Sequence, residues 1–356
     1  MSNEEDSRLR ETSVEESALA TLEKVTSRVD PAKPAFIKRK DLPEPSSTRL
    51  QATLEEHAFD LQSVTKDGLP HEIGAKQETP KTVFYLAYGS NLCAETFQGQ
   101  RGVRPISALN VVVPDLSLTF DLPGIPYNEP CFANTKYRKA SDAASVRSNG
   151  DAFHEDPEWP KGLVGVVYEI SVKDFAHVMA TEGGGAAYQD VLIDCFPLPQ
   201  GADHVPAEPN ATAFKAHTLY CPVYPPGKAP PGSNAKFGRP NPGYAQPSGR
   251  YLKLLMDGAN EHSLPLDYRM YLSKLQPYVM TTRGQRDGAF VLNWTWIPIL
   301  LKVFALQRRF TDDKGRAASW TMPIVTSVFR GIWFTYDNFF VRVFGDGERT
   351  QPVDPR

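Results

Sequence analysis

The clearest candidate for chemistry is the stretch Tyr88-Gly89-Ser90-Asn91, which follows a run of β-branched and aromatic residues over 83–87. That run predicts a buried strand, and residues 92–97 predict a short helix. A strand that enters a helix through a small glycine-containing turn directs several backbone N–H groups to one point, where an anion can bind. The glycine permits a positive φ, and the serine or asparagine can cap the helix. An ordinary strand–turn–helix corner has the same pattern, so that interpretation stays open.

Glu182 is the candidate acid/base group, because it follows a predicted amphipathic helix over 172–181 and precedes three glycines. The helix macrodipole disfavours a carboxylate at this end and tends to raise its pKa towards a proton-transfer role. The glycines would let the backbone approach a ligand closely. A solvated glutamate before a flexible loop is the alternative. Tyr188 could supply a phenol to the same pocket, although a buried core tyrosine is the commoner fate of such a residue.

Composition narrows the class of protein. The chain has 356 residues and a formal net charge of −3, which gives no electrostatic footprint for nucleic acid. Four widely spaced cysteines and seven histidines without ligand spacing predict neither a metal site nor a disulfide framework. The first residues are charged and contain no apolar segment of a secretory signal. We therefore expect a cytoplasmic protein.

The elements that must position these groups lie between residues 81 and 280. Residues 1–80 are polar and proline-punctuated, and they predict a largely disordered arm. Beyond the first strand, further strands are predicted at 107–113, 116–122, 132–137, 163–170, 188–196 and 213–220. Helices are predicted at 172–181, 250–259 and 265–275, and a proline-rich loop at 221–249.

The chain changes character from residue 290. Residues 290–344 contain Trp294, Trp296, Trp320 and Trp333 among many apolar side chains. One hypothesis is that two helices pack as a second core against the body. The other is an interfacial helix pair, with tryptophan at the headgroup level and basic residues facing anionic lipid, because neither apolar run is long and charge-free enough for a confident transmembrane helix.

Taken together, these residues resemble the γ-glutamylcyclotransferase family. The matching pieces are FYLAYGSNL from residue 84, LVGVVYEI from residue 163, Glu182-Gly183 with Tyr188 before a strand, and PSGRYLKLLMDGANEHSLPLDY from residue 247. The resemblance covers residues 81–278, and the two extensions look like those of fungal members. It implies an α+β fold, a small mixed β-barrel flanked by helices, plus a C-terminal helical extension. The implied domains are an arm (1–80), a catalytic domain (81–280) and an aromatic-rich helical extension (281–356).

The resemblance also implies the reaction. A γ-glutamyl group, of an amino acid or of a glutathione-derived conjugate, cyclises to 5-oxoproline and releases an amine without a cofactor or metal. Glu182 would be the catalytic acid/base. The implied substrate-binding residues are Tyr88, Gly89, Ser90, Asn91, Leu92, Tyr188 and Tyr251.

Two points stay open at the level of sequence. Residues 183–187 are all glycine or alanine, whereas the family usually has a bulkier residue soon after the glutamate-glycine pair. This difference widens the predicted pocket mouth and leaves the leaving group undefined. The second point is an alternative function, a catalytically silent binding or scaffold protein held at a membrane surface by residues 290–344. The presence of both Glu182 and the Tyr-Gly-Ser-Asn turn argues against it.

Overall fold

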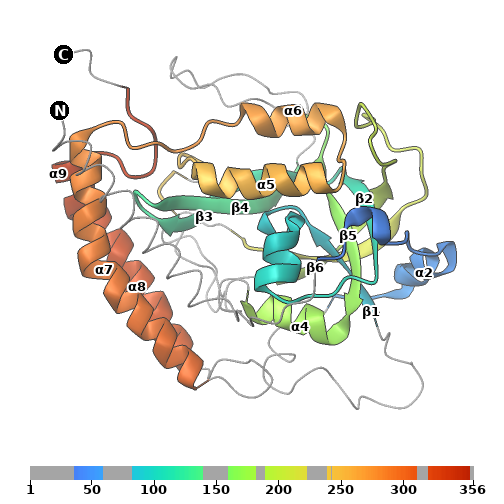
Figure 1. Cartoon of the computed structure of the whole chain (residues 1–356), viewed down its shortest axis with the longest axis horizontal. Coiled ribbons are helices and arrows are strands. Elements are labelled where there is room, and N and C mark those ends of the chain that lie inside the picture. The colour runs from blue at the N-terminus through green and yellow to red at the C-terminus, as the bar shows by residue number, and fades with distance from the viewer. Residues whose placement is uncertain are drawn as a thin grey trace.

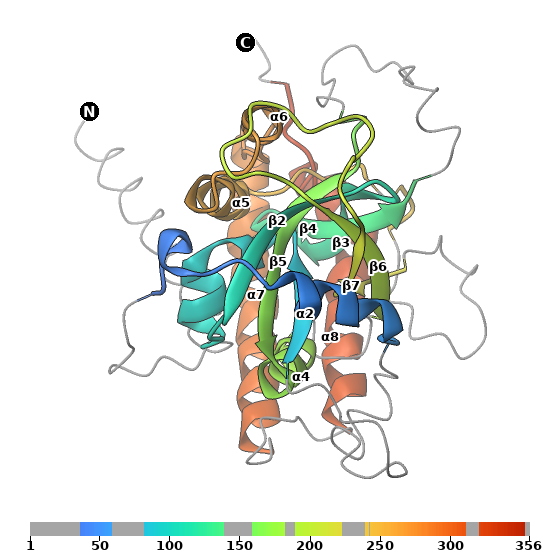
Figure 2. The same cartoon turned by 90° about the vertical axis from the view of Figure 1, so that its right-hand side faces the viewer.

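The structure, a computed structural model, describes residues 36–58, 82–138, 159–181, 189–222, 239–241, 243–310 and 320–352. Its centre is a ring of five strands in the order β1-β5-β2-β6-β7 (Figures 1 and 2). These strands are β1 (Thr82–Ala87), β2 (Ser107–Val113), β5 (Leu163–Ser171), β6 (Gln189–Pro197) and β7 (Phe214–Tyr220). The mixed sheet expected from the sequence is therefore confirmed.

Continuous apolar runs explain why the strands occupy the centre. Every residue of β2 is buried, as are five of the six in β1. Alternate side chains of these strands enter two separate apolar clusters, one on each face of the sheet. A strand buried on both faces reads as an unbroken apolar run, which is why the sequence indicated its position so closely.

The ring is not a regular barrel, because the two strands that close it, β1 and β7, share only one residue pair. Strand β1 runs antiparallel to β5 over six residue pairs, but its parallel contact with β7 consists of one pair, Tyr85 with His217. The Thr218 hydroxyl also donates to the Leu86 carbonyl at 3.1 Å. The expectation of a small mixed β-barrel needs this correction at the β1–β7 junction.

The prediction of a largely disordered arm over 1–80 is wrong for residues 36–58. This segment contains α2 (Ser47–Ala52) and a 3₁₀ turn at Thr53–Glu55, and both lie against the β1–β7 junction (Figure 2). Arg49 Nη2 donates to the Thr82 carbonyl at 3.0 Å, and the Lys215 amide donates to Thr53 Oγ1 at 2.8 Å. This segment is held by hydrogen bonds from polar side chains to the strands. Apolar periodicity in the sequence therefore gives no sign of it. Residues 1–35 and 59–81 lie outside the described residues.

Three helices flank the ring. Helix α4 (Val172–Thr181) begins at Ser171, whose Oγ accepts from the Asp174 amide at 3.0 Å. Helices α5 (Gly249–Glu261) and α6 (Leu266–Lys274) lie together above the ring in Figure 1. The Ser248 side chain caps α5 by accepting from the Tyr251 amide at 3.0 Å. All three helices were predicted from the sequence.

A second unit joins the β3–β4 hairpin to the C-terminal helices. Strands β3 (Leu116–Ile125) and β4 (Glu129–Tyr137) form their own two-stranded sheet. At its tip, Tyr127 donates its amide to the Gly347 carbonyl and its hydroxyl to the Gly345 carbonyl, both at 2.7 Å. The tip therefore docks on the chain that follows the last helix.

The C-terminal extension is a pair of long helices alongside the ring (Figure 1). Helix α7 (Arg283–Arg309) packs against α8 (Thr321–Thr335), which continues through a π-helical turn (Tyr336–Phe340) into α9 (Val341–Phe344). Their facing side chains form an apolar cluster with Ile125 and Tyr127 of the hairpin. The hypothesis of a second core is thus confirmed for the inner faces, while other side chains of the pair stay exposed.

Candidate active site

The Tyr-Gly-Ser-Asn turn begins where β1 ends. Ser90–Leu92 form one 3₁₀ turn, followed by a π-helical segment, Glu95–Gln100, instead of the short helix expected over 92–97. Gly89 has φ −106°, so the expected positive φ is wrong, and neither helical segment has a side-chain N-cap. Gly89 and Ser90 are half-buried. Within the described residues, neither main-chain N–H has a hydrogen-bond partner, as an anion site requires.

The glycine at position 89 is explained by the close approach of Tyr251 and Ala133 to its Cα, and not by its backbone φ. A Cβ there would stand 3.2 Å from the Tyr251 hydroxyl and 3.4 Å from Ala133 Cβ. The Tyr251 hydroxyl accepts from the Ala133 amide at 3.1 Å, which fixes the phenol beside the turn. The neighbouring Tyr88 is buried, and its hydroxyl donates to the Leu219 carbonyl at 2.9 Å. The structure therefore brings Tyr88, Gly89, Ser90 and Tyr251 together at one end of the ring.

Asn91 and Leu92 lie deeper than the rest of the turn. The Asn91 side chain is buried, donating from Nδ2 to the Tyr85 hydroxyl at 2.8 Å and accepting from Arg101 Nε at 2.7 Å. Leu92 is fully buried beneath α5. Both side chains hold the turn on the core, so any direct contact with a ligand would come from their main chain. Their substrate-binding role stays a prediction.

Glu182 and Tyr188 fall outside the described residues, but both ends of their segment are described. Helix α4 ends at Thr181, and β6 begins at Gln189. The next residue of β6, Asp190, pairs with Leu219, whose carbonyl accepts from Tyr88. Strand β6 therefore begins next to the β7 residue that Tyr88 bonds, and the roles of Glu182 and Tyr188 stay predictions.

Helix α5 packs closely against the turn at Gly258, where its backbone approaches Leu92 and Cys93. A Cβ at this position would lie 2.5 Å from both the carbonyl carbon and the Cβ of Leu92, and 2.6 Å from the Cys93 nitrogen. No side chain fits there unless the turn moves.

We expect Gly258→Ala to destabilise the protein by about 1–3 kcal/mol through overpacking, and to lower activity by displacing the turn. Gly249→Ala, in the same helix, is the matched control, because its added Cβ would meet only Pro277 at 3.8 Å. Denaturant unfolding and steady-state kinetics of both variants provide the measurement. Equal stabilities for the two would contradict this account of α5.

The sequence analysis missed an acid–histidine–acid cluster in which His217 and Asp190 are buried and Glu56 is half-buried. His217 Nδ1 lies 2.9 Å from an Asp190 carboxylate oxygen, and its Nε2 lies 3.5 Å from Glu56 Oε2. Arg49 Nη1 bonds Glu56 at 2.9 Å, and the Arg49 guanidinium stands 4.5 Å over the Phe84 ring. The only signal in the sequence was that Asp190 and His217 lie in two consecutive predicted strands. Glu56 comes from a segment interpreted as disordered.

This cluster predicts a pH window for stability. Burial alone would lower the pKa of His217, but hydrogen bonds with Asp190 and Glu56 outweigh it and raise that pKa above 6.5. Burial would raise the pKa of Glu56, yet His217 and Arg49 lower it below 4.5. A raised histidine pKa stabilises the fold fully below 6.5, and this contribution is lost as pH rises through the raised value. A lowered glutamate pKa stabilises the fold above 4.5, and this contribution is lost as pH falls through the lowered value.

Glu56→Gln should therefore reduce the free energy of unfolding most between pH 4.5 and 6.5, and less at either side. Urea unfolding of wild type and variant across pH measures this difference. Glu55→Gln, on the exposed neighbour in the same turn, is the control. A wild-type–variant difference that does not change with pH would show that the pair does not titrate together.

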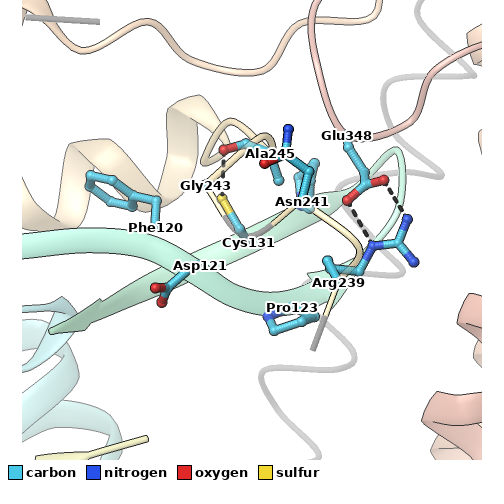
Figure 3. Close-up of a pocket in the computed structure, with 10 residues that line it drawn as sticks. Phe120, Asp121, Pro123, Cys131, Arg239, Asn241, Gly243, Ala245 and Glu348 are labelled. Carbon is cyan, nitrogen blue, oxygen red and sulfur yellow. Dashed lines mark hydrogen bonds and ion pairs between the residues drawn. The ribbon is translucent and has the colours of Figure 1, made fainter. Parts of the chain in front are cut away.

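A small hollow lies away from the turn, between the β3–β4 hairpin and the chain near Glu348 (Figure 3). It is lined by Asp121, Cys131 and Arg239 among others, and its volume for water-sized spheres is about 10 Å³. That is about room for one water molecule, so the hollow cannot hold a γ-glutamyl substrate. The described residues also contain no His, Cys, Asp and Glu group arranged for a metal ion.

The chain is similar to known γ-glutamyl cyclotransferases. The chain is 30% identical over 276 residues to the γ-glutamyl cyclotransferase gliK of Aspergillus fumigatus, covering 77% of this chain and 92% of that protein. It is 28% identical to the γ-glutamyl cyclotransferase aclK of Aspergillus oryzae, covering 76% of this chain and 92% of the relative. A solved γ-glutamyl cyclotransferase superposes with a TM-score of 0.38 at 16% identity, over 58% of this chain and 96% of that one.

The chain therefore belongs to the γ-glutamyl cyclotransferase family, as its motifs indicated. Residues 282–343 separately match the family model described as the AclK C-terminal domain. The alignment with gliK is longer than the 200 residues between 81 and 280, so the likeness extends beyond the predicted catalytic domain. The helical extension is consequently a recognisable unit shared with other proteins.

Proposed function

We propose that this enzyme cyclises the γ-glutamyl group of γ-glutamyl amino acids or glutathione-derived conjugates to 5-oxoproline and releases the amine. The observation that supports this most directly is the pair of main-chain amides at Gly89 and Ser90, which have no hydrogen-bond partner among the described residues, with the Tyr251 hydroxyl beside Gly89. Donors placed in this way suit the substrate's α-carboxylate, or the γ-carbonyl oxygen on which negative charge develops.

In the proposed reaction the substrate's own α-amine attacks its γ-carbonyl carbon. The new C–N bond closes a five-membered ring, and the bond from that carbon to the leaving nitrogen breaks. Glu182 takes a proton from the attacking amine and delivers it to the leaving nitrogen. No protein nucleophile or cofactor is needed, since the reacting groups belong to one molecule. The enzyme's task is then to hold a folded conformer, a task worth up to about 7–11 kcal/mol.

Small residues after Glu182 support a preference for bulky leaving groups. Residues 183–187 carry no side chain larger than a methyl group, which is the sequence basis for expecting a wide pocket mouth. We therefore expect glutathione S-conjugates to be used at least as well as γ-glutamyl dipeptides.

The test is incubation of the full chain with γ-glutamyl amino acids, glutathione and glutathione S-conjugates. Mass spectrometry should detect 5-oxoproline and the released amine in equal amounts. If none of these substrates yields 5-oxoproline while the protein is folded, the silent scaffold on the same fold would replace the proposal.

We also propose a cytoplasmic location, with residues 290–344 able to lie at a membrane surface. All four cysteines lie within the described residues, are buried and form no disulfide. Reduced cysteines of this kind suit a reducing compartment.

A further inference from the structure

The α7–α8 pair concentrates exposed apolar side chains. Of the seventeen large hydrophobic residues exposed in the described parts of the chain, ten lie between 290 and 343. Trp294 is 77% exposed and Phe334 is 69% exposed, the highest fractions among them. Isolated surface hydrophobics need no explanation, but a concentration of this kind marks an interaction surface.

These side chains are not an unfinished core. The inner face of α7 is already buried through residues such as Leu292 and Leu300, which pack with Ile332 and Trp333. Phe290 and Trp294, one turn apart on α7, and Phe334 on α8 are exposed, and we call the sides of the helices that carry them the outer faces. The helix pair runs alongside and past the strand ring in both views (Figures 1 and 2). This leaves the outer faces open to a partner.

The charges on the outer faces have one dominant sign. Within the described residues of 283–344, the exposed basic residues are Arg283, Arg286, Lys302, Arg309, Arg330 and Arg342. Asp287 is the one exposed acidic residue in the same stretches. Asp337 is half-buried and is paired with Arg239. Indole and phenyl rings interspersed with exposed basic side chains suit a membrane surface, which has negatively charged headgroups over an apolar interior.

The charge of the outer faces also distinguishes between two possible partners, a second copy of the chain and a lipid surface. In a symmetric contact with a second copy, each basic face would meet another basic face, and like charges would repel. An anionic lipid surface supplies both the negative charge and the apolar layer. Among the described residues, Arg283–Gln307 is the one stretch long and apolar enough to cross a bilayer by length and composition alone. Crossing would extract the inner face of α7 from its core with α8, so contact in the plane of the surface fits the packing better.

We propose that the outer faces of α7 and α8 bind an anionic membrane surface, with Trp294 and Phe334 inserted among the headgroups and the basic residues facing lipid phosphate and carboxylate. Binding is peripheral and reversible. It does not depend on the proposed reaction.

The experiment is co-sedimentation of the full chain with two kinds of vesicle, phosphatidylcholine alone and phosphatidylcholine mixed with phosphatidylserine. We expect binding to the mixed vesicles that weakens with added salt, because the attraction is screened. Lys302→Gln with Arg330→Gln should lower the affinity about fivefold per charge removed. Trp294→Ala with Phe334→Ala should reduce it further, without loss of helicity in circular dichroism.

Leu266→Ala with Met270→Ala is the matched control, because it removes two exposed apolar side chains from α6. It should bind as wild type does. Failure of the wild type to bind, or equal binding by the Trp294 and control variants, would overturn the proposal. A dimer in light scattering that the Trp294 variant abolishes, without vesicle binding, would assign the face to a second copy instead.

Discussion

Glu182→Gln is expected to lower kcat by about 10²–10⁴-fold while leaving the fold intact. The amide keeps the size and shape of the carboxylate but cannot accept the proton that the α-amine must lose. Because the amides of Gly89 and Ser90, which we propose hold the substrate, are untouched, KM should change little, which is the pattern of a group that acts in the transition state.

The measurement is the initial rate of 5-oxoproline formation at saturating substrate, with thermal unfolding as the check on folding. Glu208→Gln, at an exposed glutamate, is the matched control and should behave as wild type. If Glu182→Gln retains the wild-type kcat, the acid/base lies elsewhere. The two carboxylates of the His217 cluster, Asp190 and Glu56, would then be tested next.

Arg239→Ala is expected to lower the free energy of unfolding by about 3 kcal/mol, the cost of removing one partner from a buried ion pair. Arg239 bonds both Asp337 oxygens at 2.7 and 2.8 Å and both Glu348 oxygens at 2.6 and 3.0 Å, and its guanidinium lies 4.0 Å over the Trp333 ring. Glu348 is buried, so removal of its partner leaves an uncompensated charge away from water, the costly case for a buried pair. Figure 3 shows the Arg239–Glu348 pair beside the β3–β4 hairpin.

Denaturant unfolding is the measurement, and Lys253→Ala is the control. Lys253 also pairs with an acidic residue, Asp257, but at an exposed helix surface, where such pairs contribute about 0–1 kcal/mol. Arg239→Lys should be intermediate, since a lysine keeps the charge but not the bidentate geometry. Arg239→Ala stability within the range of the control would mean that the C-terminal helices are held by apolar packing alone.

The sequence determined the elements whose signals are local. The strands β1 and β5 follow from near-continuous apolar runs, and α4 follows from apolar spacing with a serine cap. The apolar run of β1 also locates the Tyr-Gly-Ser-Asn turn, which follows it directly. The motif of this turn indicates the family that the relatives confirm. Each of these signals lies within about ten residues, so the chain specifies it without knowledge of its neighbours.

Only the tertiary structure showed which distant segments contact one another. Arg239 meets Asp337 and Glu348 across about a hundred residues, and Glu56 reaches His217 from a segment without apolar periodicity. Gly89 is needed because Tyr251, 162 residues later, stands against it, and not because of its own φ. Polar pairing and close approach depend on which distant segments the chain folding brings together. A periodic pattern records which face of an element is buried, but not which partner covers it.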